Sequence, residues 1–361
     1  MSFSIDRMYE MNPFSLERNE KNELLTQELK ELTRFHFEHC TTYRDILKGL
    51  NTDIDRVHSY YDLPFIPVRL FKNHDLLSVP SSEIFKTMTS SGTSGQGVSK
   101  IFVDKITANY QQKALIKIMS DFIGKKRLPM LIIDSPNVVK DRNLFSARGA
   151  AILGLRMFAR DVIYALDDNM ELKLDLVNDF INEHSDGPIL IFGFTFMIWQ
   201  HLYQKLRSLN TRLDLSHAYL VTGGGWKKLV TLNITNEMFR ECLNERCGIS
   251  RFVDHYGMVE QTGCIYAQCE CGHLHASIFS DVIPRRTSDF SVCETGEEGI
   301  IQVVSVLPHS YPGHSLLTED QGIILGEDDC PCGRKGKYFK LTGRIKHAEL
   351  RGCSDTYAQK F

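Results

Sequence analysis

No run of apolar residues in this chain approaches the ~18 that a membrane-spanning helix requires, so the sequence predicts no transmembrane segment. The N-terminal residues Met1 to Arg7 also lack the apolar core of a secretory signal peptide. Neither sign of charge dominates, because the formal net charge is −3 at pH 7, and no basic footprint for nucleic acid is present. These absences predict a cytoplasmic protein without a nucleic-acid partner. Its 10 cysteines are then expected to be mostly reduced.

Internal repeats and long low-complexity segments are also absent, and 361 residues of which 42% are hydrophobic suit one large or two modest globular domains. Residues 15–48 have the periodicity of an amphipathic helical opening. Up to about residue 254, helical patterns then alternate with short apolar runs. The helical patterns cover 106–123, 171–184, 195–208 and 227–247, and the strand-like runs cover 130–134, 188–193, 218–222 and 251–254. This alternation predicts an α/β fold with a mostly parallel sheet flanked by helices, followed from about residue 276 by a β-rich subdomain.

The most informative stretch is a run of hydroxyl-bearing residues and glycines between two strand-like segments. Residues 89–100 read TSSGTSGQGVSK, and they lie between the runs 83–88 and 100–103. Glycine allows positive φ and close approach of a ligand, backbone N–H groups can surround an anion, and Lys100 adds a positive charge. A flexible linker has a similar composition, but a linker seldom lies between two strands of one domain. We therefore interpret the run as a phosphate-binding loop with contacts from Thr89, Ser90, Ser91, Gly92, Thr93, Ser94 and Gly95.

The loop is not a Walker A sequence, because no Gly-Lys-[Ser/Thr] follows its glycines at the required spacing. It resembles the phosphate loop of the acyl-adenylate-forming superfamily, which is Ser/Thr-rich and continues with Gly-Thr-[Ser/Thr]-Gly and a lysine. Three later segments resemble motifs of the same superfamily in the same order. They are Tyr256–Glu260 (Tyr-Gly-x-Thr-Glu), Thr318–Gly322 (Thr-x-Asp-x-Gly) and Gly343–Lys346 (Gly-Arg-x-Lys).

The resemblance implies a role for each motif. Tyr256 would stack on adenine beside Gly257, Glu260 would hold Mg²⁺ through its carboxylate, and Asp320 would accept hydrogen bonds from the ribose hydroxyls. Arg344 would mark the hinge of the family. Val259 stands where the motif has threonine, which leaves open which hydroxyl assists Glu260. The segment Gly223, Gly224 and Gly225 would lie under an adenine edge, although a turn at a helix N-terminus explains these glycines equally well.

Only 15 residues follow Lys346, too few for the mobile C-terminal domain of longer superfamily members. This tail, the chain length and the segment 141–150 resemble the acyl-protein synthetases, the fatty-acid-activating subunits of the bacterial bioluminescence fatty-acid reductase. The resemblance implies an adenylate-forming domain over 1–343, with its β-rich part at about 276–343, and a short tail over 344–361. In that family a cysteine near the C-terminus carries the acyl group as a thioester, and Cys353 matches it. A terminal cysteine without a role is the alternative.

Two Cys-x-Cys pairs, each followed by glycine, suggest a structural zinc site. The pairs are Cys269 with Cys271 and Cys330 with Cys332. Thiolates in a reduced compartment are typical zinc ligands, and His275 could replace one cysteine, as similar segments of phenylacetate–CoA ligases indicate. The alternative is four reduced surface cysteines.

The predicted activity is ATP-dependent activation of a fatty acid to acyl-AMP, transfer to Cys353 and delivery to an acyl reductase. An acyl-CoA ligase of the phenylacetate type is the second hypothesis, and a non-catalytic adenylate-binding scaffold is the third. CoA dependence and ATP–pyrophosphate exchange separate the three. The catalytic residues would be Cys353, Glu260, Lys100 and Arg344. An aromatic cluster would line the acyl slot unless it belongs to the core, and its residues are Phe192, Gly193, Phe194, Phe196 and Trp199.

Overall fold

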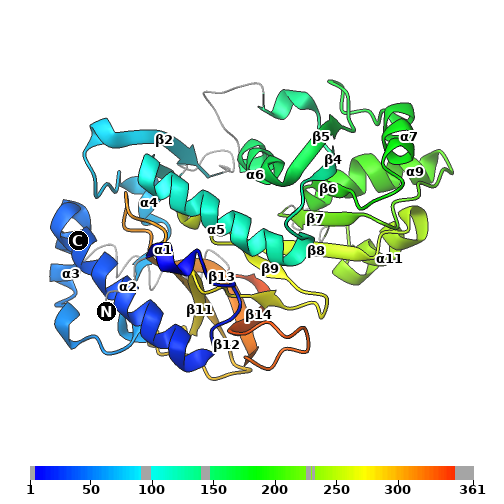
Figure 1. Cartoon of the computed structure of the whole chain (residues 1–361). Helices are drawn as coiled ribbons and strands as arrows, with labels where there is room; N and C mark the ends of the chain where they lie inside the picture. The colour runs from blue at the N-terminus through cyan, green and yellow to red at the C-terminus, as the bar shows by residue number, and fades with distance from the viewer. Residues whose placement is uncertain (1–4, 91–98, 140–146, 225–228, 230–231, 346–361) are drawn as a thin grey trace. The chain divides into compact units, whose positions relative to one another are not determined.

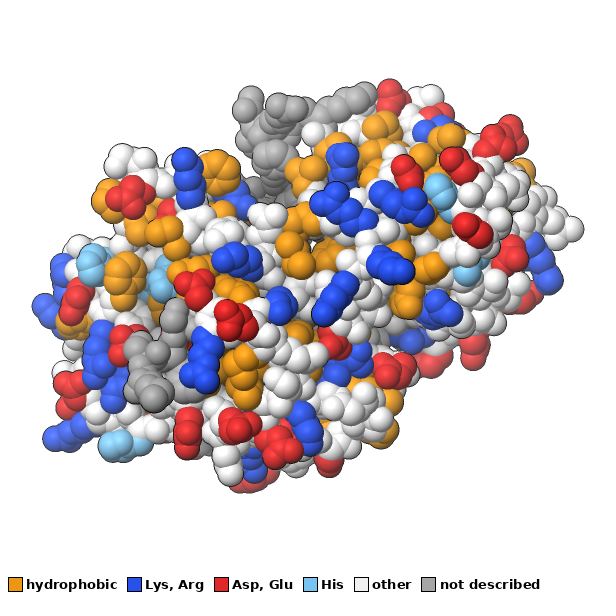
Figure 2. Space-filling view, in the orientation of Figure 1, with side chains coloured by type: hydrophobic (Ala, Val, Ile, Leu, Met, Phe, Trp, Pro, Cys, Tyr) orange, Lys and Arg blue, Asp and Glu red, His pale blue; other side chains and the backbone are white. Residues whose placement is uncertain are grey.

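The computed structural model describes residues 5–90, 99–139, 147–224, 229 and 232–345. The chain divides into two compact units. The first unit contains residues 1–118, 257–266 and 271–361, and the second contains 119–256 and 267–270. Among the described residues, no helix combines the length and the apolar character needed to cross a membrane. Figure 2 shows positive and negative side chains interspersed over the viewed face, in agreement with the small net charge.

The second unit is built on a parallel sheet (Figure 1). Its strands lie in the order β8-β7-β6-β4-β5, and every neighbouring pair is parallel. The predicted parallel α/β fold is therefore confirmed. The strands are β4 (Leu128–Ile132), β5 (Ala159–Tyr164), β6 (Leu190–Gly193), β7 (Tyr219–Gly223) and β8 (Arg251–Tyr256), and the helices between them include α6 (Ala147–Leu155), α7 (Leu174–Glu183), α9 (Gln204–Ser208) and α11 (Asn236–Cys247).

The core of this unit forms between the sheet and its helices. Leu131, Ile191 and Leu220 point from three adjacent strands into one buried cluster, as expected for short apolar strands covered on both faces. The predicted helix over 195–208 consists of α8 (Thr195–Met197), a π-helical segment (Ile198–Tyr203) and α9. Trp199 belongs to the cluster and stacks on Tyr203 with ring centroids 4.4 Å apart.

Two elements of the second unit differ from the sequence-based expectation. Strand β5 was not predicted, because it lies at the end of the strand order and two adjacent exposed polar residues, Arg160 and Asp161, interrupt its apolar pattern. The helix expected over 227–247 is not continuous in the described residues: residue 229 is helical, 232–235 are not, and α11 begins at Asn236. Thr235 caps it by accepting a hydrogen bond from the Met238 N–H (3.2 Å), which explains why the helix starts there.

The first unit contains an antiparallel sheet, which confirms the predicted β-rich region. The strand order is β11-β12-β13-β14-β10, and β1 (Ile66–Pro67) pairs in parallel with β13. The strands are β10 (Leu274–His275), β11 (Ser280–Arg285), β12 (Glu298–Ser305), β13 (Ser315–Glu327) and β14 (Lys337–Arg344), with β9 (Tyr266–Gln268) preceding them. A separate hairpin pairs β2 (Ile84–Thr89) with β3 (Lys100–Asp104).

Helices open the first unit, as the periodicity of residues 15–48 predicted. They are α1 (Ile5–Met8), α2 (Arg18–His39), α3 (Thr41–Gly49) and the short α4 (Leu70–Asn73). Helix α5 (Lys105–Ile123) follows the β2–β3 hairpin and leads into β4.

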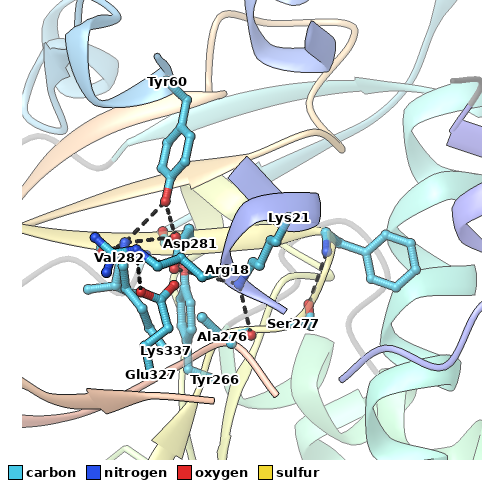
Figure 3. A network of polar contacts seen from close by, with 12 residues as sticks. Arg18, Lys21, Tyr60, Tyr266, Ala276, Ser277, Asp281, Val282, Glu327 and Lys337 are labelled. Carbon is cyan, nitrogen blue, oxygen red and sulfur yellow. Dashed lines mark hydrogen bonds and ion pairs between the residues drawn. The ribbon is translucent and has the colours of Figure 1, made fainter. Parts of the chain in front are cut away.

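A buried ionic network joins α2 to the sheet (Figure 3). The ammonium of Lys337 donates to Asp281 Oδ2 at 2.8 Å, and Lys21 lies 3.6 Å from Asp281 Oδ1. The Tyr60 hydroxyl donates to the same carboxylate. Burial alone would raise the pKa of Asp281, but the charges of Lys21 and Lys337 lower it to about 2. Asp281 is therefore ionised and holds residues that are more than 200 positions apart in the chain.

Candidate active site

The described ends of the glycine-rich loop are held together at its base. Thr89 and Lys100 are paired at the end of the β2–β3 hairpin. Beyond them, the Ser90 N–H donates to the Ser99 carbonyl (3.2 Å), and the Ser99 N–H donates to Ser90 Oγ (3.0 Å). A closed base is what a phosphate-binding loop between two strands requires. The expected contacts of Ser91, Gly92, Thr93, Ser94 and Gly95 lie outside the described residues and stay predictions.

Glu260 is buried in a short helical turn (Val259–Gln261), with 6% of its surface exposed. Its carbonyl accepts a hydrogen bond from the Tyr311 hydroxyl at 2.9 Å. The neighbouring Gln261 donates to the carbonyls of Val303 (3.2 Å) and Gly313 (2.8 Å). The turn that carries the carboxylate is thus fixed from two sides.

The carboxyl group of Glu260 has few counter-charges for a buried acid. Burial raises its pKa, and this is opposed, in decreasing order, by the hydroxyl of Ser99, the backbone N–H of Glu260 itself and the charges of Lys72 and Arg344. The Ser99 hydroxyl is buried near this carboxyl group and has no hydrogen-bond partner among the described residues. A buried, weakly neutralised carboxylate fits a magnesium ion, which prefers oxygen ligands.

Asp320 and Arg344, two residues singled out by separate sequence motifs, form an ion pair. They are paired across β13 and β14, and Arg344 Nε donates to Asp320 Oδ1 at 2.7 Å. The Asp320 N–H donates to Thr318 Oγ1 at 3.1 Å, which fixes the backbone of the motif within β13. The Asp320 carboxylate and the exposed Arg344 side chain therefore meet where strand β14 ends.

Sequence reasoning missed two cations beside this motif. Arg69 pairs with Glu319, and Val68 N–H donates to the Leu317 carbonyl at 2.9 Å, so the segment before α4 lies along β13. Burial would raise the pKa of Glu319, but Arg69, Arg344 and Lys72 lower it. In the sequence these cations are only two basic residues shortly after Pro67, Arg69 and Lys72. Such a pair is too common to indicate a functional site. Lys100, which was predicted to act on phosphate, is exposed.

In the second unit, residues of the other nucleotide motifs lie at the carboxyl ends of two neighbouring parallel strands, β7 and β8. A Cβ on Gly223, the last residue of β7, would lie 2.3 Å from Cε1 of His255. Gly224 has φ +64°, and its Cα faces the Phe194 ring. Tyr256 ends β8 and Gly257 follows it, half-buried and exposed respectively. Gly225 lies outside the described residues. Ends of parallel strands are the usual place for a ligand site in such sheets.

The residues expected to line an acyl slot differ in exposure. Phe192 and Trp199 are buried, and Gly193 is tightly packed, since a Cβ there would lie 2.8 Å from Ile198 Cγ1. Phe194 is half-buried and packs against the core cluster. An acyl slot at this place stays a prediction.

Three of the four paired cysteines, together with His275, form a candidate metal centre. One ligand atom each from Cys269, His275, Cys330 and Cys332 lies within 4.8 Å of all the others. Cys332 Sγ is 3.4 Å from His275 Nε2, and His273 Nδ1 is 3.3 Å from Cys330 Sγ. Two or three thiolates with imidazole suit tetrahedral zinc.

His275, the alternative ligand of the sequence analysis, takes the place expected for Cys271. The physical reason is the turn between β9 and β10, in which Gly272 has φ +81°. Cys271 at this turn is exposed, whereas the His275 side chain is buried from strand β10. The predicted acyl-accepting Cys353 lies outside the described residues.

Comparison with known proteins identifies the family of this chain. The family model described as acyl-protein synthetase, LuxE, matches residues 2–361. A long-chain-fatty-acid–luciferin-component ligase of Vibrio harveyi is 21% identical over 365 residues, which cover 99% of this chain and 93% of that protein. A ligase of the same name from Photorhabdus luminescens is 29% identical over 90 residues, 25% of this chain and 77% of that protein.

Solved structures of 2-hydroxyisobutyryl-CoA ligase share the fold. The complex with 2-hydroxyisobutyryl-AMP and CoA in the thioesterification state gives a TM-score of 0.71 at 16% identity, covering 93% of this chain and 70% of that chain. The open conformation gives 0.70 at 14% identity, with 91% and 71% covered. The predicted fold class is therefore confirmed.

Proposed function

The chain belongs to the acyl-protein synthetase (LuxE) family and is a ligase, and from this we propose that it activates a long-chain fatty acid with MgATP and then carries the acyl group on Cys353. In the first half-reaction a carboxylate oxygen attacks the α-phosphorus of ATP. Acyl-AMP forms and pyrophosphate leaves. In the second, the Cys353 thiolate attacks the acyl carbonyl, a thioester forms and AMP leaves.

The observation that carries the first half-reaction is the buried Glu260 carboxylate at the base of the glycine-rich loop. Glu260 would hold Mg²⁺, which neutralises charge on the phosphates when it is bound. The loop N–H groups and Lys100 would contact the phosphates, and Asp320 would accept hydrogen bonds from the ribose. The protein thus acts by positioning the nucleotide and matching its charge.

The second half-reaction is supported by the family and by the chemistry of the tail. An acyl adenylate is a mixed anhydride, and a thiolate is the strongest nucleophile among ordinary side chains near neutral pH. Arg351 next to Gly352 would favour the thiolate of Cys353 by its positive charge. A cysteine that carries the acyl group as a thioester suits delivery to a separate reductase subunit, which is the partner we propose.

We further propose that Cys269, His275, Cys330 and Cys332 hold a structural zinc ion. Cys269 follows β9, His275 lies in β10, and Cys330 and Cys332 lie between β13 and β14, so a metal would link three segments of the chain. His273 beside Cys330 would act as an outer hydrogen-bond partner. The ion would stabilise the fold, because a structural metal contributes folding free energy.

ATP–pyrophosphate exchange in the presence of fatty acids tests the adenylation step. Exchange that depends on a long-chain acid is the expected result, and the absence of exchange with every acid would leave only a scaffold. Thioester formation on the protein without CoA separates an acyl-protein synthetase from an acyl-CoA ligase.

A further inference from the structure

Glu260 lacks the hydroxyl neighbour that its motif usually provides. Val259 occupies the place of the threonine in Tyr-Gly-x-Thr-Glu, and valine can neither donate nor accept a hydrogen bond. The carboxylate is nevertheless buried, and an oriented buried carboxylate normally has hydrogen-bond partners. A hydroxyl beside this carboxylate must therefore come from elsewhere in the chain.

Thr262, the nearest threonine in sequence, is used differently. Its hydroxyl donates to the Val259 carbonyl at 2.9 Å and lies 3.8 Å from Met88 Sδ. The second contact also shows that the β2–β3 hairpin lies against the turn that carries Glu260. Residues at the open end of this hairpin are thus within reach of the carboxylate.

Ser99 lies at that end with its hydroxyl available. Its side chain is 1% exposed, and its backbone is held on both sides by Ser90. Oγ is buried and has no hydrogen-bond partner among the described residues. It lies close enough to Glu260 to oppose the rise in the pKa of that carboxyl group that burial causes. Hydrogen bonds in a ligand-free site are often long and shorten when the ligand binds.

We propose that Ser99 supplies the hydroxyl that Val259 lacks, donating a hydrogen bond to the Glu260 carboxylate and orienting it toward bound MgATP. The inference rests on the proposed adenylation. Ser99 is a positioning residue, since it acts through Glu260. Ser99 would then serve two purposes, because its backbone N–H and carbonyl close the loop base with Ser90 and its side chain orients the carboxylate of the turn at 259–261.

The test compares Ser99→Ala, Ser99→Thr and the double variant Ser99→Ala/Val259→Thr. We expect Ser99→Ala to lower kcat of ATP–pyrophosphate exchange about 10- to 100-fold, as loss of an orienting hydrogen bond does. Ser99→Thr should retain the activity, and Val259→Thr should restore at least part of it in the Ser99→Ala background. The matched control is Ser82→Ala, an exposed serine before β2, which should behave as wild type.

Calorimetric titration without acid provides a readout other than turnover. Ser99→Ala should weaken binding of MgATP about fivefold or more, and it should leave binding of ATP in excess EDTA unchanged, because Glu260 acts on the nucleotide through the metal. Ser99→Cys, which keeps the size of serine but is a weak donor, repeats the test if Ser99→Ala does not fold.

Each result decides between the proposals. Wild-type kcat and MgATP affinity in Ser99→Ala, or equal weakening with and without metal, would overturn the role of Ser99. In both cases the wild type would still catalyse ATP–pyrophosphate exchange, so the proposed adenylation would be unaffected. An inactive wild type would instead overturn the proposed adenylation.

Discussion

The imidazole of His255 lies directly against the Cα of Gly223. The two residues are paired across β7 and β8, and a Cβ on Gly223 would lie 2.3 Å from Cε1 and 2.7 Å from Nε2 of the ring. Burial lowers the pKa of His255, so the ring is neutral at pH 7. Packing against His255 thus explains why residue 223 is a glycine, whether or not it also contacts adenine.

Gly223→Ala should therefore destabilise the protein and reduce exchange activity. The added methyl group must displace the ring, and overpacking of this kind costs about 1–3 kcal/mol. Thermal unfolding is the measurement, and His255→Ala in the same chain should recover part of the loss. Gly187→Ala is the control, because nothing lies within 4 Å of a Cβ there. A Gly223→Ala protein as stable as wild type would refute the packing argument.

Removal of the proposed zinc should lower stability in a residue-specific way. We expect about one zinc ion per chain by elemental analysis. Cys332→Ser should lose the metal and unfold at a lower temperature, because Cys332 belongs to the cluster. Cys271→Ser is the matched control, since Cys271 is exposed and outside the cluster, and it should keep both metal and stability. Equal metal content in the two variants would contradict the assignment.

Asp281→Asn should be strongly destabilising. The change removes the negative charge that Lys21 and Lys337 share in a buried site. Breaking a buried ion pair by removal of one partner costs about 3–5 kcal/mol, because the remaining charge is uncompensated. Urea unfolding measures the loss, with the exposed Asp186→Asn as control. A shift as small as that of the control would mean that the network contributes little.

Two buried histidines should make the protein sensitive to acid. His36 and His314 stack with ring centroids 4.9 Å apart, and both are buried. Burial and the neighbouring His309 lower the pKa of His314 to about 3, and burial also lowers the pKa of His36. In the unfolded chain a histidine has a pKa of about 6.5, so the unfolded state binds more protons below that pH.

Stability should therefore fall as the pH decreases from about 6.5 toward 3, by about 1.4 kcal/mol per pH unit for each fully responding histidine. The melting temperature between pH 7 and pH 4.5 measures this slope. His314→Gln should melt lower at pH 7, because it disturbs the packing, but its slope with pH should be smaller. An unchanged slope would exclude His314 as the responsible group.

The parallel strands and the nucleotide motifs could be predicted from the sequence, because each of them depends on residues that are neighbours in the chain. The apolar run at 188–193 and the glycines at 223–225 are local signals. Edge strand β5 was missed because Arg160 and Asp161 interrupt its apolar pattern.

Contacts between distant residues had no such signal. Lys21 and Lys337 meet Asp281 only in the folded chain. The role inferred for Ser99 depends on its approach to Glu260, and the choice of His275 over Cys271 depends on the geometry of one turn. Sequence composition identifies the residue types at these places, but folding decides which of them meet.

The central claim is that an acyl group activated as acyl-AMP is transferred to Cys353. Intact-protein mass spectrometry after incubation with ATP, Mg²⁺ and a panel of carboxylic acids tests it most directly. The wild type should gain one acyl group, removable by hydroxylamine, with at least one long-chain acid. Cys353→Ser should gain none while it retains ATP–pyrophosphate exchange. A wild type without any adduct, or an adduct that persists in Cys353→Ser, would contradict the account.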